Sequence, residues 1–192
     1  MIENRFSLIE KIQQKISITE KEKAHLLVTW QSVKLAKNEY LIKEGYKSQY
    51  LYFILSGYVR CFHCDDEGNE ITTELLGNDF ITSFESFIKE EISTENIQCV
   101  KPCEVLRITK SEYDMLYQTI LEWPVFCKEV YEELILRKNK RLYSLQNLSA
   151  KERYAEVMKN QPGLIQNIPI KYMASYLGIK QQSLSRIRKG NY

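Results

Sequence analysis

Residues 168–192 read IPIKYMASYLGIKQQSLSRIRKGNY, and this stretch decides the fold. Apolar residues recur in its first half at three- and four-residue spacing, which predicts a short helix packed on one side: Ile170, Met173, Ala174 and Leu177. Gly178 permits the left-handed step of a tight turn. A second helix follows, with a buried edge made of Ile179, Leu184 and Ile187. The pattern predicts a helix-turn-helix, with a plain helical hairpin as the alternative.

The polar side of the second helix carries cations and no acids. Its residues outside the apolar edge are Gln181, Gln182, Ser183, Ser185, Arg186, Arg188 and Lys189. Residues 149–192 hold eight Lys or Arg and two acids, although the whole chain, with 27 basic and 25 acidic residues, has a net charge of only +2. An acidic body with a basic end indicates a polyanionic partner for that end. A helix-turn-helix reads double-stranded DNA with its second helix in the major groove.

Length and composition limit the remaining possibilities. A chain of 192 residues that is 44% hydrophobic can bury a core of its own. No apolar run approaches 18 residues, and the charged start lacks the apolar centre of a signal peptide, so we expect no membrane span and a cytoplasmic location. Five cysteines, an odd number, argue against a disulfide framework.

The first two thirds of the chain predict helices followed by a β-roll. Residues 1–30 look helical, and Thr19 with Glu22 forms a capping box. Residues 33–108 contain short aromatic and β-branched runs with glycines at positions 45, 57, 68 and 77. The segment 65–69 reads as a hairpin turn between strands at 58–64 and 70–76. Evenly spaced short strands predict an antiparallel, jelly-roll-like β-roll within an α+β fold.

A long helix is predicted from Pro124 to about Leu148. At roughly 24 residues it would span about 36 Å. Its apolar edge is longer than the roll can cover, which favours a parallel helix pair in a homodimer; the edge consists of Val130, Leu134, Leu142, Leu145 and Leu148. Ser149 and Glu152 form a second capping box, where we place a hinge. We expect that helix to end at Pro162-Gly163 and Pro169 to begin the helix-turn-helix. The predicted domains are 1–122, 123–148 and 149–192.

This order of elements resembles the Crp/Fnr family of bacterial transcription regulators. The roll carries the family's pattern in KEG at 43–45, YFILSG at 52–57, EGNE at 67–70 and GNDFI at 77–81. The end carries it in ASYLGI at 174–179 and SLSRI at 183–187. The resemblance implies a cyclic-nucleotide-binding-like sensor domain, a dimerisation helix and a DNA-binding domain. It also allows RNA polymerase as a further partner. Many relatives have a β-hairpin wing next to these two helices. This sequence lacks it, so we expect a minimal DNA-binding domain.

The resemblance places the effector pocket at Thr82, Ser83, Ser93 and Thr94. Family members that bind cyclic AMP have a Gly-Glu pair at the first two positions and an arginine at the third, which grips the cyclic phosphate. Here Ser93 replaces that arginine and Glu95 follows two residues later. A guanidinium forms two parallel charge-assisted bonds to a phosphate, which a hydroxyl cannot do. We therefore expect that cyclic AMP does not bind, while the identity of any other effector stays open.

Other cofactors and catalysis are not expected. The iron–sulfur branch of the family has a cysteine cluster near the N-terminus, whereas the first cysteine here is Cys61. Cys61 and Cys64, and Cys99 and Cys103, are predicted to pack as small hydrophobic side chains rather than to bind a metal. Only His25 and His63 could ligate haem. A jelly-roll metalloenzyme needs several converging His and carboxylate ligands, so we expect no enzyme.

In the second helix, Gln182 and Arg186 lie one turn apart and are expected to read base edges, with Gln181 exposed beside them. Ser183, Arg188 and Lys189 are better placed for phosphates. Lys180 stands at the cap position, where Ser or Thr is usual. The favoured function is a homodimeric transcription regulator that reads a near-palindromic DNA site. The alternative is a ligand- or protein-binding sensor whose DNA head no longer functions.

Overall fold

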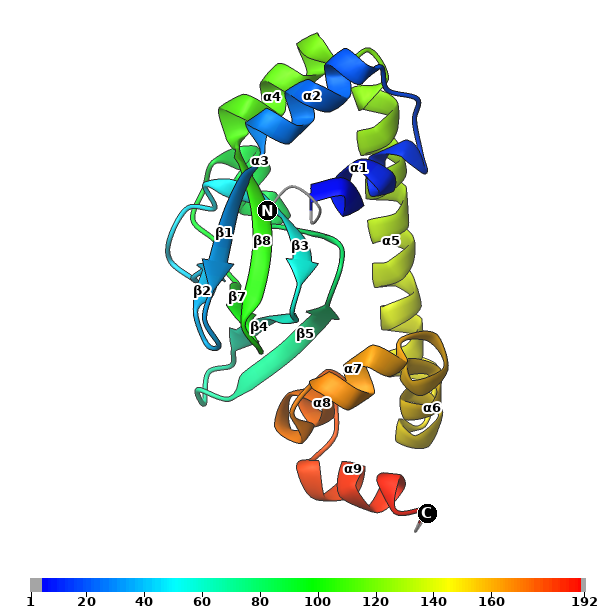
Figure 1. Cartoon of the computed structure of the whole chain (residues 1–192). Coiled ribbons are helices and arrows are strands. Elements are labelled where there is room, and N and C mark those ends of the chain that lie inside the picture. Colours follow the sequence, from blue (N-terminus) through cyan, green and yellow to red (C-terminus); the bar gives the residue numbers. More distant parts are fainter. Residues whose placement is uncertain (1–4, 191–192) are drawn as a thin grey trace.

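The predicted roll is present as two antiparallel sheets. The computed structural model describes residues 5–190, and within them eight strands form two four-stranded sheets (Figure 1). One sheet has the order β1-β8-β3-β6 and the other β2-β7-β4-β5. The strands are β1 (Gln31–Leu35), β2 (Tyr40–Ile42), β3 (Tyr50–Ser56), β4 (Val59–Cys64), β5 (Glu70–Leu76), β6 (Phe80–Ile81), β7 (Asn96–Cys99) and β8 (Cys103–Thr109). Apolar side chains such as Ile54, Val59 and Ile97 fill the space between the sheets.

The β4–β5 hairpin forms where it was predicted. The Asp65 carboxylate accepts hydrogen bonds from the backbone N–H groups of Glu67 and Asn69 at 3.0 and 2.8 Å, which fixes the turn. The β4–β5 register shifts between Cys61 and Phe62, so that Cys61 pairs with Glu74 but Phe62 with Thr72. Cys61 lies in the core between the sheets. Because strand residues alternate between faces, Arg60 and Phe62 point to the opposite, outer face.

Helices cover the outer face of the β1-β8-β3-β6 sheet. They are α1 (Phe6–Gln13), α2 (Glu20–Thr29) and α4 (Lys110–Thr119), and they share a core with the strands that includes Leu8, Trp30 and Leu106. The predicted capping box of Thr19 and Glu22 is confirmed at the start of α2. The short helix α3 (Phe84–Lys89) was not predicted; it interrupts the segment read as strands only.

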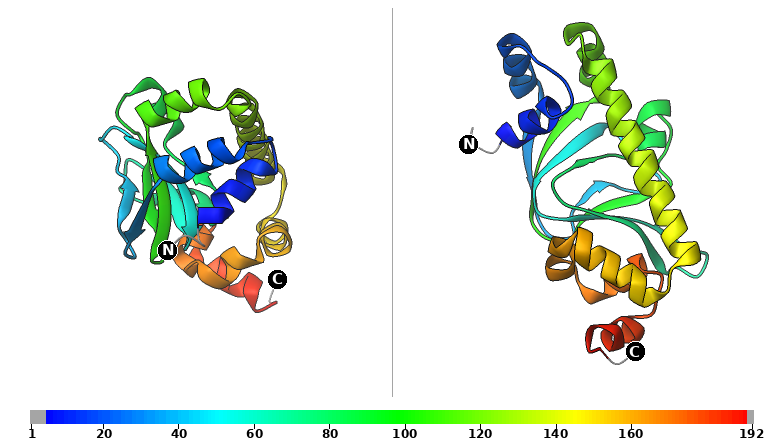
Figure 2. Two further views of the ribbon diagram at one scale, coloured as in Figure 1. Left: turned by 45° about the horizontal axis from the view of Figure 1, so that its top comes forward. Right: turned by 90° about the vertical axis from the view of Figure 1, so that its right-hand side faces the viewer.

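The long helix is confirmed as α5 (Trp123–Asn147), with Pro124 in its first turn. It runs along the side of the roll, as the right-hand view of Figure 2 shows. Trp123 and Phe126 anchor its first turns in the helical core. Further along, the Arg137 guanidinium forms ion pairs with the Glu74 and Asp79 carboxylates, each at 2.8 Å. Among residues 5–190, no helix combines the length and the apolarity that crossing a bilayer requires.

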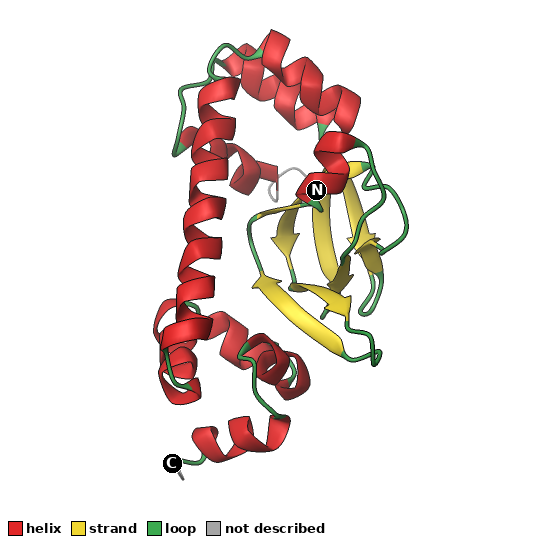
Figure 3. Ribbon diagram, turned by 180° about the vertical axis from the view of Figure 1, so that it is seen from behind, coloured by secondary structure: helices red, strands yellow, loops and turns green. Residues whose placement is uncertain are grey.

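The end of the chain forms a helical head, by which we mean residues 149–190. It contains α6 (Ala150–Asn160), α7 (Pro162–Asn167), α8 (Ile170–Tyr176) and α9 (Gln181–Arg188), coloured red below the sheets in Figure 3. The Ser149–Glu152 capping box at the start of α6 is confirmed. The reading of Pro162-Gly163 as a stop was incomplete, because Pro162 also starts α7. A proline is permitted in a first helical turn, where its missing N–H has no intrahelical partner.

Three of the four cysteines predicted to pack as small hydrophobic side chains, Cys61, Cys99 and Cys103, are buried. Cys127, for which no prediction was made, is buried as well. The prediction was wrong for Cys64, which is exposed because the end of β4 leads into the protruding turn of the hairpin.

Gly57 is expected to be the glycine of the roll least tolerant of substitution. Its φ is +93°, and a Cβ there would lie 2.5 Å from the Pro102 carbonyl oxygen and 2.6 Å from Cys103 Sγ. Gly68 has a similar φ of +80° but nothing within 4 Å. Gly68→Ala should lower the free energy of unfolding by roughly 1–2 kcal/mol through backbone strain. Gly57→Ala should lower the free energy of unfolding by at least about 1 kcal/mol more than Gly68→Ala, because of steric overlap. Urea unfolding measures both losses. Equal losses would contradict this account of Gly57.

Candidate nucleic-acid interface

Helices α8 and α9 meet at the predicted glycine turn. Gly178 has a φ of +67°, and the N–H groups of Gly178 and Ile179 bond the carbonyls of Ser175 and Ala174 at 3.0 Å each. Ala174 and Leu184 are buried where the two helices pack on each other. Lys180 occupies the N-cap of α9 with no side-chain hydrogen bond there, as the sequence indicated. The turn therefore holds α9 at a fixed angle to α8.

The polar residues of α9 form one outward face. Five of the six candidate contact residues are exposed: Gln181, Gln182, Arg186, Arg188 and Lys189. Ser183 is half-buried, and Leu184 points inward. The structure thus gathers the predicted residues on one side of one helix. No acid lies on α9, so this face carries positive charge and no negative charge, together with glutamine amides that can both donate and accept hydrogen bonds.

Two arginines hold the C-terminal end of α8. Arg141 of α5 donates to the Tyr176 carbonyl, and its guanidinium lies 4.0 Å from the centre of the Tyr176 ring. Arg153 of α6 donates to the Leu177 carbonyl at 3.0 Å. Burial lowers the pKa of Arg141, with the neighbouring Arg153 adding to the effect. Cations at a helix C-terminus satisfy carbonyls that have no partner in the helix.

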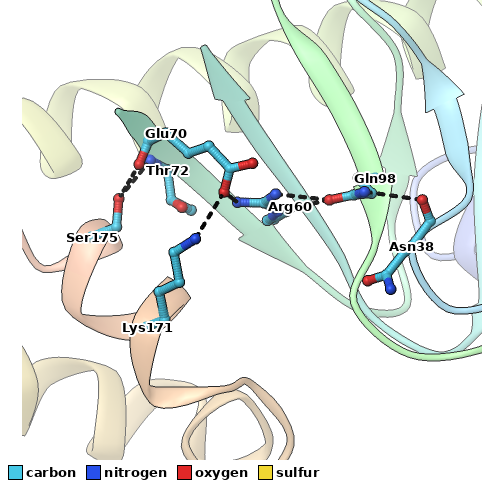
Figure 4. Close-up of polar contacts among 7 residues, drawn as sticks. All are labelled: Asn38, Arg60, Glu70, Thr72, Gln98, Lys171 and Ser175. Atoms are coloured by element: carbon cyan, nitrogen blue, oxygen red, sulfur yellow. Dashed lines mark hydrogen bonds and ion pairs between the residues drawn. The ribbon is translucent and has the colours of Figure 1, made fainter. Parts of the chain in front are cut away.

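The side of α8 that faces the roll is attached to β5. The Ser175 hydroxyl accepts a hydrogen bond from the Thr72 N–H at 2.8 Å and donates one to the Glu70 carbonyl at 3.0 Å (Figure 4). Strand β5 is at the edge of its sheet, so these backbone groups have no neighbouring strand to pair with. Lys171 of α8 also lies 3.5 Å from the Glu70 carboxylate. One side chain of the head thus takes the place of the missing strand.

Beneath this contact lies a buried arginine. Arg60 of β4 is 2% exposed, and its guanidinium is stacked between the rings of Phe62 and Tyr172, 3.8 and 3.9 Å from their centres. It donates to the Gln98 side-chain oxygen at 2.7 Å and to the Glu70 carboxylate at 2.9 Å (Figure 4). Stacking of a desolvated guanidinium on a ring contributes about 2 kcal/mol. Sequence reasoning missed Arg60, Tyr172 and Ser175 altogether.

Three of the four candidate effector positions, Thr82, Ser83 and Ser93, are buried in the roll, and Ser83 and Ser93 bond to each other. The Ser93 hydroxyl is 3.0 Å from that of Ser83 and 2.8 Å from the Glu95 carbonyl oxygen. Thr82 donates to the Tyr50 carbonyl at 2.9 Å. Thr94, by contrast, is exposed. Burial raises the pKa of the Glu95 carboxyl, an effect that Lys138 opposes. The cluster thus offers hydroxyls that already have partners, next to a carboxyl group.

The outer side of α5 is apolar and uncovered. Ile135, Leu136, Leu142 and Tyr143 are between 55 and 68% exposed. At 100° per residue they share the side of the helix that faces away from the roll. Of the predicted dimer residues, Leu142 belongs to this face, whereas Val130 packs partly against the roll's helical core and Leu134 is half-buried. Leu145 reaches the turn at Gly178, with its Cδ2 3.4 Å from where a Cβ would lie.

One part of this architecture matches a known protein family. Residues 32–119 match the family described as the cyclic nucleotide-binding domain. A search of curated protein sequences finds no match. The family match covers the roll and α4 and leaves α5 and the head outside.

Solved structures resemble the chain over most of its length. FixK2 from Bradyrhizobium japonicum has a TM-score of 0.71 at 14% identity, covering 84% of this chain and 83% of its own. CLP from Xanthomonas campestris, a c-di-GMP responsive global regulator, has 0.69 at 17%, covering 90% and 91%. The catabolite activator protein of Thermus thermophilus has 0.57 at 21%, covering 91% and 84%. At these identities the likeness establishes a shared fold of roll, long helix and head.

The Arg60–Glu70 pair is expected to make stability depend on pH. The hydrogen bond from Arg60 holds the pKa of Glu70 below its ordinary value of about 4.5. The contribution of the Arg60–Glu70 pair to the stability of the fold is therefore complete at a pH above the ordinary pKa of Glu70. It is lost as the pH falls through the lowered pKa. Glu70→Gln should lower the free energy of unfolding by about 1–2 kcal/mol at pH 7, since the pair is only partly screened. Urea unfolding between pH 3 and 7 should show the difference shrinking at the acidic end; a constant difference would contradict the assignment.

Proposed function

We propose that the chain is a homodimeric, DNA-binding transcription regulator of the Crp/Fnr type that acts in the cytoplasm. The observation that carries the proposal is the outward face of α9, where Gln182, Arg186 and Lys189 are exposed while Leu184 anchors the helix in the head. An exposed, acid-free helix held at a fixed angle by a glycine turn can enter the major groove. The fold shared with FixK2 and CLP supports this role.

Each part of the chain then has a task. Residues 1–122 form the sensor domain, 123–148 the dimerisation helix and 149–192 the DNA-binding domain; residues 1–4 and 191–192 lie outside the described part of the chain. Two subunits joined along α5 would place two copies of α9 on half-sites one helical turn apart. RNA polymerase is the partner that such a bound dimer would recruit or exclude.

The effector is not expected to be cyclic AMP. A cyclic phosphate at Ser93 would have to displace the hydroxyl's bond to the Glu95 carbonyl and would approach the Glu95 carboxyl group. It would gain no guanidinium in return, because Ser93 stands where cyclic-AMP-binding members of the family have arginine. The roll therefore either binds another ligand or influences DNA binding through its contacts with the head.

DNA recognition is tested by two substitutions on α9. Gln182→Ala should relax the base preference at one position of a site selected from random duplexes, because it removes a bidentate contact to a base edge. Lys189→Ala should weaken binding to DNA of every sequence alike and lower the salt dependence of binding, because it removes a phosphate contact. Gel-shift titrations at two salt concentrations measure both effects. Identical behaviour of the two variants would refute this division of roles, and no duplex binding at low salt would favour a sensor with an inactive head.

Dimerisation is tested on the outer side of α5. Ile135 is 58% exposed in the middle of the apolar face, so Ile135→Lys should raise the dimer dissociation constant at least about tenfold by placing a charge in a desolvated seam. Leu121→Lys is the matched control, because Leu121 is 90% exposed and lies before α5 begins. Sedimentation equilibrium measures the mass of each variant. A monomeric wild type, or equal dimerisation of both variants, would refute the α5 interface.

A further inference from the structure

The contact between α8 and β5 has the features of a contact built to open. We call the residues Arg60, Glu70, Thr72, Lys171, Tyr172 and Ser175 the latch. Strand β5 and α8 are separated by about a hundred residues in the sequence, and the hydrogen bonds of Ser175 join them directly (Figure 4). The latch fixes the angle between the roll and the helix that precedes the reading helix.

Closing the latch buries one hydroxyl without a partner and removes a guanidinium from water. The Thr72 side chain is 2% exposed, and its hydroxyl has no hydrogen-bond partner. The Arg60 guanidinium is removed from water partly by the Tyr172 ring, which covers one of its faces. Both groups would regain water if α8 moved away, because α8 lies against β5 and its Tyr172 ring lies over Arg60. Hydration of these groups therefore offsets part of what is lost on opening.

The closed latch also works against DNA. In a helix-turn-helix the first helix crosses the phosphate backbone. Lys171 lies in the first turn of α8, and it faces Glu70 at 3.5 Å. The turn that leads into Glu70 adds three further carboxylates, those of Asp65, Asp66 and Glu67. A duplex along α8 would meet these four negative charges as long as the head stays on β5.

From these contacts we infer that the latch is an autoinhibitory lock: the closed head binds DNA weakly, and a tight complex requires α8 to leave β5. The inference rests on the proposed DNA-binding function and adds its regulation. Any event that weakens the β5 edge or neutralises Glu70 raises the affinity for the duplex. The Arg141 contact to Tyr176 lies on α5, outside the latch, and keeps the head attached to the long helix when the latch opens.

Ser175→Ala tests the lock with little change in volume. It removes both hydrogen bonds to β5 and touches none of the candidate DNA contacts on α9. We expect the full-length variant to bind its selected duplex about 5- to 50-fold more tightly than the wild type, the range of ordinary coupling between sites. Thr73→Ala is the control, because Thr73 is exposed on the same strand and does not belong to the latch. Its affinity should equal that of the wild type.

Hydrogen exchange at the Thr72 amide reports the latch without DNA. This N–H bonds only Ser175, so it should be protected in the free wild type and exchange rapidly in Ser175→Ala. In the wild type, a saturating concentration of duplex should also make the Thr72 amide exchange rapidly. A Thr72 amide that stays protected in the DNA complex would overturn the inference, because the latch would then be closed in the bound state.

A reversible cross-link supplies the opposite perturbation. Thr72→Cys with Ser175→Cys, in a Cys64→Ser background, should form a disulfide that holds α8 on β5. The oxidised protein should bind duplex at least about tenfold more weakly than the same protein after reduction. Equal affinities of the oxidised and reduced forms, or an unchanged or weaker affinity of Ser175→Ala with a rapidly exchanging Thr72 amide, would overturn the lock and leave the proposed function intact. Failure of the wild type and every variant to bind duplex would overturn both.

Discussion

The burial of one guanidinium ties the head to the roll. Arg60 is 2% exposed, and its partners come from different parts of the chain: Gln98 on β7, Glu70 on β5 and Tyr172 on α8. A buried charge is tolerated only while its partners stay in place, since removing one of them leaves the charge uncompensated. The positions of the sheet and the head are therefore not independent. Moving α8 changes the solvation of Arg60, and altering β4 changes the surface on which α8 rests.

The strand register is what presents this arginine to the head. Alternation along β4 sends Cys61 into the core between the sheets and Arg60 to the outer face, and a slip of one residue would exchange them. Thr73 is the extra residue of a bulge in β5, between the Cys61–Glu74 and Phe62–Thr72 pairs. The bulge keeps Thr72 beside Phe62 on that outer face, while Glu74 turns towards α5. Glu74 then pairs with Arg137 at 2.8 Å. One bulged strand thus contacts both the head and the long helix, on its two faces.

Local signals in the sequence were sufficient for much of the fold and for little of the interface. The capping box at Ser149, the turn at residues 65–69 and the glycine step at Gly178 are fixed by neighbours within a few residues, and all three were predicted correctly. Helices α3 and α7 were missed because six residues give no readable period. The Arg60–Tyr172 contact spans more than a hundred residues and leaves no local trace. Helix α5 is apolar on two sides, so periodicity could not show that Val130 faces the roll and Ile135 faces outward.

Inside the roll, the hydroxyl groups of Ser83 and Ser93 already have partners. A phosphate pocket needs donors that are incompletely satisfied until the anion arrives, because otherwise binding only exchanges one set of hydrogen bonds for another. At Ser83 and Ser93 the donors are satisfied within the protein, and the carboxyl of Glu95 stands beside them. On the outer face beneath the head, by contrast, the Thr72 hydroxyl is buried without a hydrogen-bond partner. The hydrogen bonds of Ser175 join the roll to the head at this same strand, β5.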